Sequence, residues 1–310
     1  MTFADMRAVA PKVYNNWRDM LLSDLYMKAL KILEQGDREA VDPARLLALT
    51  KSELRTQLGS GDAERTRSLE EFLERMPDRY FLITPRQDIP YHFDLMRRLD
   101  GSALVCQHRH FPDREFSEFI VATHDQHGLF SKIAGVLTAN NLNILSARIT
   151  TRADGVVMDV FRVSHGRGGM ALEDDRWLRV ERDLERVISG QQDIETLVAE
   201  AHVAQTSGRK FLRRVATEVT VDNRSSEQFT VVDVFTQDRV GLLFAITHTL
   251  FKLGLLIHFA RISTNADQAL DVFYVSDRAG GKITDLERMR ELRETLLAKV
   301  EEDPAESATA

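Results

Sequence analysis

Two stretches of this chain decide its fold: residues 119–130, which read FIVATHDQHGLF, and residues 232–243, which read VDVFTQDRVGLL. Each is an apolar run that ends in an Asp-x-x-Gly-Leu turn, and the two aspartates, Asp125 and Asp238, lie 113 residues apart. Similarity within one chain at a fixed separation is typical of a repeated structural unit. The sequence therefore predicts two copies of one module.

The predicted elements follow the same order in each copy: strand, turn, helix, strand, hairpin, strand and second helix. The separation of 113 residues carries 142–144 onto 255–257, and it shortens by one at a hairpin turn, 152–155 against 265–268. A turn tolerates such a change, whereas a slip within a strand would move every side chain to the other face. Two helices on one face of a sheet define a ferredoxin-like βαββαβ sandwich, so the expected fold class is α+β.

The flanking sequence is helical before the repeat. Apolar residues recur at three-, four- and seven-residue intervals between Val13 and Leu33, and similar patterns cover 45–58 and 64–75, which predicts helices with one apolar face. The expected boundaries are a helical segment over 1–76, a connector with a strand over 77–116, a first domain over 117–203, a linker and strand over 204–228, a second domain over 229–303 and a frayed tail over 304–310.

Composition narrows the class of protein. The 310 residues carry a formal net charge of −7, which disfavours a nucleic-acid binder that relies on attraction to phosphates. No apolar stretch approaches the ~20 residues that span a bilayer, and the N-terminus lacks the pattern of a secretory signal. The only cysteine, Cys106, fits a reducing compartment. We therefore expect a cytoplasmic protein that contacts neither nucleic acid nor membrane.

The repeated pattern resembles the ACT domain, on the strength of the Asp-x-x-Gly-Leu turn, the Asn-Ile strand and the Asp-x-Phe strand found in register. Residues 2–9, Trp17, the 77–81 junction and the tandem second copy resemble the C-terminal part of the bifunctional uridylyltransferase/uridylyl-removing enzymes. That family modifies the nitrogen-signalling protein PII, and the resemblance covers essentially the whole chain. It implies that glutamine is the effector and that the ligand lies where two ACT modules pack together.

Catalytic motifs are not evident in this chain. The family's nucleotidyltransferase and metal-dependent hydrolase domains lie outside the part that the chain resembles, so any magnesium would belong to those domains. Gly101-Ser102 has no paired aspartates nearby to hold a metal. We therefore expect no catalytic residue, no cofactor and no metal in this chain, although a catalytic partner on another polypeptide stays open.

Histidines offer an alternative. His124-Asp125 imitates a hydrolase dipeptide, but the repeat aligns it with Gln237-Asp238, and we interpret it as a turn. His108, His110 and His127, with Cys106, allow a metal site on adjacent strands, although their spacing matches no known ligand pattern.

The candidate ligand site lies around the two turns. Each turn opens a helix whose N-terminal amides attract a carboxylate, each aspartate can accept from an α-ammonium group or cap the helix, and asparagine amides suit a glutamine side chain. The candidate binding residues are Asp125, Gly128, Leu129, Asn140, Asn141, Asn143, Ile144, Asp238, Gly241, Leu242 and Ile257. Because only the first copy has the asparagines, residues 125–144 are the favoured site and the second copy is its partner.

The leading functional hypothesis is a regulatory fragment that senses an amino acid and belongs with a PII uridylyltransferase. The resemblance implies that this amino acid is glutamine. The modules would pair within one chain or across a homodimer. PII or a separate catalytic chain are the candidate partners. The alternatives are an independent ACT-type adaptor and a subunit of a split uridylyltransferase. The basic run over 209–214 is interpreted as a solvated linker or as a surface for an acidic partner.

Overall fold

The computed structural model describes residues 42–59, 63–165, 174–205, 215–265 and 268–302. The chain divides into two compact units, residues 1–53 and 54–310. Helix α3 (Pro43–Leu58) begins in the first unit, and the rest of the fold below belongs to the second. The predicted helix over 13–33, the basic run over 209–214 and the tail over 304–310 lie outside the described residues.

Helices lead into the first sheet, as the apolar spacing predicts. They are α3 (Pro43–Leu58), α4 (Ala63–Arg75), α5 (Asp78–Ile83) and α6 (Ile89–Arg98). Helix α4 buries Leu69, Phe72 and Leu73, the face expected from the sequence. Helix α5 was not predicted. Six residues are too few for a clear period, and tertiary contacts hold this helix: Tyr80 is buried, and its hydroxyl lies 2.8 Å from His92 Nδ1.

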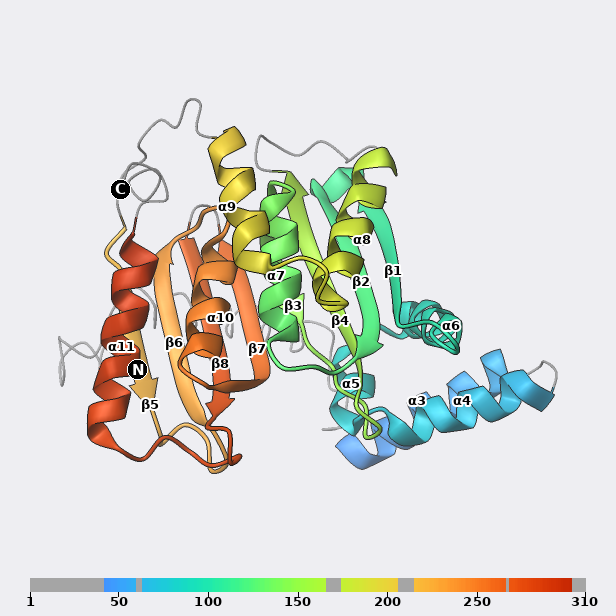
Figure 1. Cartoon of the computed structure of the whole chain (residues 1–310). Helices are drawn as coiled ribbons and strands as arrows, with labels where there is room; N and C mark the ends of the chain where they lie inside the picture. Colours follow the sequence, from blue (N-terminus) through green and yellow to red (C-terminus); the bar gives the residue numbers. More distant parts are fainter. Residues whose placement is uncertain (1–41, 60–62, 166–173, 206–214, 266–267, 303–310) are drawn as a thin grey trace. The chain divides into compact units, whose positions relative to one another are not determined.

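The first module has a four-stranded antiparallel sheet in the order β1-β2-β4-β3. Its strands are β1 (Leu104–Phe111), β2 (Phe116–His124), β3 (Leu142–Arg148) and β4 (Val156–His165). Helices α7 (Leu129–Ala139) and α8 (Asp174–Ile188) cover one face (Figure 1). Trp177 of α8 stacks on Phe119 of β2 with ring centroids 5.2 Å apart, and both side chains are fully buried.

The second module repeats this arrangement, with the strand order β5-β6-β8-β7. Its strands are β5 (Glu218–Asp222), β6 (Thr230–Gln237), β7 (Leu256–Asn265) and β8 (Gln268–Ser276), and its helices are α10 (Leu242–Lys252) and α11 (Leu286–Glu301). The predicted α+β class and the two similar modules after a helical segment are confirmed.

The place of the fourth strand in the chain differs from the βαββαβ order. In each module it precedes the repeated stretch: β1 pairs with β2, and β5 pairs with β6. A short 3-10 turn at Pro112–Arg114 joins β1 to β2. The strand that pairs with the edge of β2 can come before or after it in the sequence, because the antiparallel hydrogen bonds are the same in both cases. The tight turn brings β1 to this edge at little entropic cost. The predicted strand in the connector is thus an edge of the first sheet.

The two modules meet within one chain. Edge strands β3 and β7 lie side by side, and α7 packs against α10 (Figure 1). Helix α9 (Ile194–Gln205) follows α8 and contacts both α7 and α10, with Glu195 paired to Lys252 at 2.5 Å. Each edge strand has an irregularity at the same repeat position, between Ile144 and Ser146 and between Ile257 and Phe259. The hydrophobic core is continuous across this contact.

No helix in the described part of the chain combines the length and the apolar character needed to cross a membrane.

Candidate functional site

The turn between β6 and α10 forms one wall of the candidate site. Gly241 occupies the N-cap position of α10 with φ of 87°, and no side chain caps the helix there. Gly128 does the same before α7, with φ of 75°. A side chain is strained at such angles, which explains the glycine in each turn. Asp125 and Asp238 therefore do not act as helix caps, and the amides at the start of α10 face the turn.

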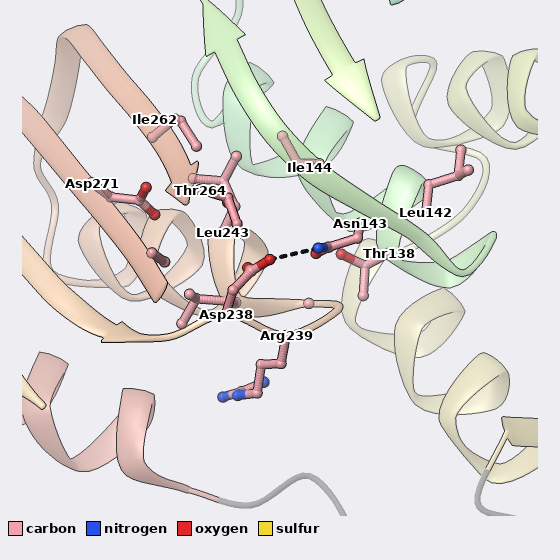
Figure 2. Close-up of a pocket in the computed structure, with 13 residues that line it drawn as sticks. Thr138, Leu142, Asn143, Ile144, Asp238, Arg239, Leu243, Ile262, Thr264 and Asp271 are labelled. Carbon is pink, nitrogen blue, oxygen red and sulfur yellow. Dashed lines mark hydrogen bonds between the residues drawn. The ribbon is translucent and has the colours of Figure 1, made fainter. Parts of the chain in front are cut away.

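A small pocket lies where this turn meets the first module. Residues from α7, β3, the β6–α10 turn, β7 and β8 line it (Figure 2), among them Thr138, Asn143, Asp238, Gly241, Thr264 and Asp271. The space open to the centres of water-sized spheres is about 10 Å³, which is room for roughly one water molecule. An amino acid therefore enters only if the two modules or their side chains move.

A hydrogen bond between the modules closes the pocket. Asn143 Nδ2 on β3 donates to Asp238 Oδ2 at 2.6 Å (Figure 2). Burial raises the pKa of Asp238, and hydrogen bonds from Asn143, from the Arg239 backbone and from Thr264 lower it in part. Donors around this carboxyl group thus offset much of the cost of burying its charge. An incoming ligand that carries both donors and acceptors can replace Asn143 as the partner.

A second carboxyl group lies deeper in the pocket. Asp271 of β8 is 2% exposed, and its Oδ1 atom has no hydrogen-bond partner. Burial raises the pKa of Asp271 to about 8, and the neighbouring charge of Asp238 adds to the rise. The group is therefore protonated at neutral pH. The backbone amide of Ser263 donates to the carboxyl group, and Oδ1 is its unpartnered atom.

An aromatic ring covers the other turn. A Cβ atom placed on Gly128 would lie 2.7 Å from the Phe251 ring, and His127 packs on the same ring with centroids 4.6 Å apart. At the second turn the residue in this place is Thr138, whose methyl carbon would lie 3.0 Å from a Cβ on Gly241. Thr138 and Phe251 are separated by the repeat distance of 113 residues. The two turns are thus related by the repeat but differ in the side chain that faces them.

Thr138→Phe is expected to remove ligand binding without unfolding the chain. Phe251 already fits in the corresponding place at the first turn, so the added ring should fill the pocket and part Asn143 from Asp238. Titration calorimetry with L-glutamine should show at least about a tenfold loss of affinity, about 1.4 kcal/mol or more. Phe251→Thr is the matched control and should leave binding at the Asp238 turn unchanged. Full affinity in Thr138→Phe would contradict this assignment of the pocket.

The predicted residues divide into two groups. Asn143, Ile144, Asp238, Gly241 and Leu242 come together in the pocket. The remaining six lie outside its lining: Asp125, Gly128, Leu129, Asn140, Asn141 and Ile257.

Asn140 and Asn141 contribute to the end of α7. The Asn140 amide nitrogen donates to Val136 O and to Asp183 Oδ2, both at 3.0 Å, and Asn141 has a left-handed φ of 57°. Asp125 is exposed, in contrast to the half-buried Asp238. Ile257 lies on β7 and packs against the core. Sequence reasoning missed Thr138 and Asp271, although the repeat aligns each with a residue of the other copy.

The histidine alternative finds no support in the geometry. His108 stacks on Trp177 with centroids 4.7 Å apart, His110 Nδ1 lies 3.0 Å from Ser117 Oγ, and His127 lies against Phe251. In the described ranges, no three His, Cys, Asp or Glu side chains are grouped in a way that could hold a metal ion.

The fold and the paired turns define a protein with tandem ACT domains. Residues 118–169 match the ACT domain family, and residues 218–303 match the ACR9-like, ACT-like domain family. The second match begins at Glu218, the first residue of β5, so the strand that precedes the repeat is part of the module.

The chain is related over nearly its whole length to bifunctional uridylyltransferase/uridylyl-removing enzymes, as the sequence motifs predicted. It is 35% identical to the enzyme of Gluconobacter oxydans over 98% of the chain, 34% identical to that of Azospirillum brasilense over 96%, and 33% identical to that of Rhodospirillum rubrum over 97%. It spans 32% of the length of each relative, which is consistent with their C-terminal, ACT-containing part.

Proposed function

We propose that this chain is an amino-acid-sensing regulatory part of a PII uridylyltransferase/uridylyl-removing enzyme and that its ligand is glutamine. The observation that supports this most is the Asn143–Asp238 hydrogen bond, which joins β3 of the first ACT module to the β6–α10 turn of the second. The closed pocket holds about one water, so ligand entry and the packing of the modules are coupled. A ligand that favours one packing over another shifts their balance, which is what an allosteric regulator requires.

The chemistry of the pocket suits a zwitterion. The N-terminal end of α10 carries partial positive charge and suits the ligand's carboxylate. Asp238 and Asp271 suit its ammonium group, and the Asn143 amide suits a side-chain amide, since each amide both donates and accepts. Glutamine carries all three groups. This arrangement supports a site between the second turn and the β3 strand of the first module.

The catalytic setting of the sensor is also a proposal. By its relatives, the regulated activities are uridylyl transfer and uridylyl removal, the regulated target is PII, and the catalytic domains are carried by sequence outside these 310 residues or by a second chain. We infer a cytoplasmic location, because Cys106, the one cysteine of the sequence, is unpaired, which fits a reducing compartment.

Asn143→Leu tests the proposed site. The substitution keeps the number and branching of the side-chain heavy atoms, removes the amide and leaves Asp238 without its partner across the modules. We expect the affinity for L-glutamine, measured by titration calorimetry, to fall at least about tenfold, which corresponds to about 1.4 kcal/mol. The matched control is Asn140→Ala, which removes an amide of the same segment that bonds to Asp183 outside the pocket. Unchanged affinity in Asn143→Leu would reject the site.

A thermal-shift screen of the twenty amino acids separates this proposal from an independent adaptor with another ligand. Stabilisation by glutamine alone, growing with its concentration, supports a glutamine sensor. Stabilisation by a different amino acid would identify that amino acid as the ligand and would reject glutamine sensing. UMP transfer to PII by the isolated chain would overturn the regulatory assignment.

A further inference from the structure

The Oδ1 atom of Asp271 is a polar atom that the fold leaves without a partner in the pocket, although the backbone amide of Ser263 donates to the same carboxyl group. The Asp271 side chain is 2% exposed, its Oδ1 atom accepts no hydrogen bond, and its carboxyl group is turned toward the space beside Asp238 (Figure 2). A buried acceptor without a donor costs free energy, so such a group is retained where a ligand supplies the missing donor.

We propose that Asp271 binds the ammonium group of the ligand and gives up its own proton in doing so, so that one proton passes to solvent for each amino acid bound. Asp238 is the second carboxylate around the same ammonium group. This inference rests on the proposed function, since it needs an amino acid in the pocket.

The charges around Asp271 favour this exchange. Burial and the nearby Asp238 keep the carboxyl group of Asp271 neutral in the unliganded protein. A cation within a few ångströms of a carboxyl group favours its ionised form. The ammonium group would therefore reverse the effect of burial, and the proton of Asp271 would leave.

Several elements present side chains to the pocket around Asp271. The β6–α10 turn presents Asp238 and Arg239, whereas β3, β7 and α10 present Asn143, Thr264 and Leu243. Arg239 Nη2 lies 3.5 Å from the carbonyl oxygen of Val300 in α11. Asp238 is thus the charged group most directly coupled to Asp271, and it raises the pKa of Asp271.

The first module contains a matched carboxyl group that does not line the pocket. Asp159 occupies the Asp-Val-Phe position of β4 and is 1% exposed, and its Oδ1 accepts from the Thr150 amide at 3.3 Å. Burial also raises its pKa to about 8. Asp159 therefore shares the burial and the protonation of Asp271 but faces the turn that Phe251 covers.

Titration calorimetry with L-glutamine in buffers of different ionisation enthalpy measures the protons released. At pH 7 we expect close to one proton for each ligand, and an affinity that rises about tenfold for each pH unit between 6 and 7.5 and levels off near pH 8. Asp271→Asn should abolish the proton release and weaken binding at least about tenfold. Asp159→Asn should change neither. 4-Carbamoylbutanoate, which is glutamine without its ammonium group, should bind at least about 100-fold more weakly and release no proton.

The outcomes separate the two claims. Glutamine binding whose heat does not depend on the buffer overturns this inference and leaves the proposed function standing. Unaltered proton release in Asp271→Asn also overturns the inference. If none of the twenty amino acids binds the wild-type chain, the proposed function fails and the inference fails with it. The buffer series on the wild-type chain and the deaminated ligand give a result even if Asp271→Asn does not fold.

Discussion

Gly135→Val is expected to lose about 3 kcal/mol of stability and to disrupt the contact between the two modules. Gly135 lies in α7, where α9 and α10 approach it most closely. A Cβ atom there would lie 2.5 Å from Ile194 Cγ1 and 2.9 Å from Phe244 Cδ2, distances that real side chains do not tolerate. Valine adds two further methyl groups, so α9 or α10 must move. Because the ligand pocket depends on the same contact, glutamine binding should be lost as well.

Urea denaturation followed by circular dichroism measures the first effect, and titration calorimetry measures the second. The rescue variant is Gly135→Val with Ile194→Ala, which removes the atoms nearest to the new side chain. It should recover part of the stability and of the affinity, whereas Ile194→Ala alone should be mildly destabilising. If the double variant is less stable than Gly135→Val by the full cost of Ile194→Ala, the two residues do not compete for this space, and the prediction fails.

Asp159→Asn is expected to stabilise the protein at pH 8 and to have almost no effect at pH 4. Burial raises the pKa of Asp159 from 3.8 to about 8. The folded protein therefore retains a proton that the unfolded chain loses above about pH 4. Between pH 4 and pH 8 the folded state binds more protons, and stability falls as the pH rises. Asparagine cannot ionise, so the variant avoids this loss.

The expected gain for Asp159→Asn grows from near zero at pH 4 to on the order of 5 kcal/mol at pH 8. Urea midpoints at pH 4, 6 and 8 measure it. Asp113→Asn, which changes an exposed aspartate, should show no such trend. A constant difference between wild type and Asp159→Asn across this range would mean that the buried carboxyl group is not protonated in the folded state. Asp159→Asn with Asp271→Asn should show a larger gain than either substitution alone.

Much of the fold followed from the repeat, because strand and helix periods and the Asp-x-x-Gly turns are local properties of the sequence. The helix pattern over 64–75 and the strands on either side of Pro112 needed no tertiary information. The edge position of β1 required tertiary information, because the sequence of a strand does not indicate which neighbour it pairs with. Helix α5 was missed for the related reason that burial of Tyr80, and not its propensity, holds it.

The candidate site was less accessible to sequence reasoning. The repeat indicated the turns at Asp125 and Asp238 equally. The pocket lies at the Asp238 turn, where Thr138 takes the place that Phe251 has at the other turn. Thr138 and Phe251 lie on helices, where a difference between two side chains in the sequence does not indicate a binding site. Asp271 was aligned with Asp159 as part of a strand, yet its role depends on what surrounds it. Alignment of the two copies identifies such pairs, and only packing tells which member faces the pocket.

The leading strands also bear on the origin of the repeat. Val105 pairs with Ala122 and Glu218 pairs with Phe235, so β1 and β5 hold the same register to their neighbours with the same 113-residue separation as the first strand of the repeat. The segment duplicated in the ancestral gene thus included this strand, and its junction lay upstream of Leu104 and not at Phe116. A single module expressed by itself should therefore start before Leu104, since a shorter fragment leaves the β2 edge open to aggregation.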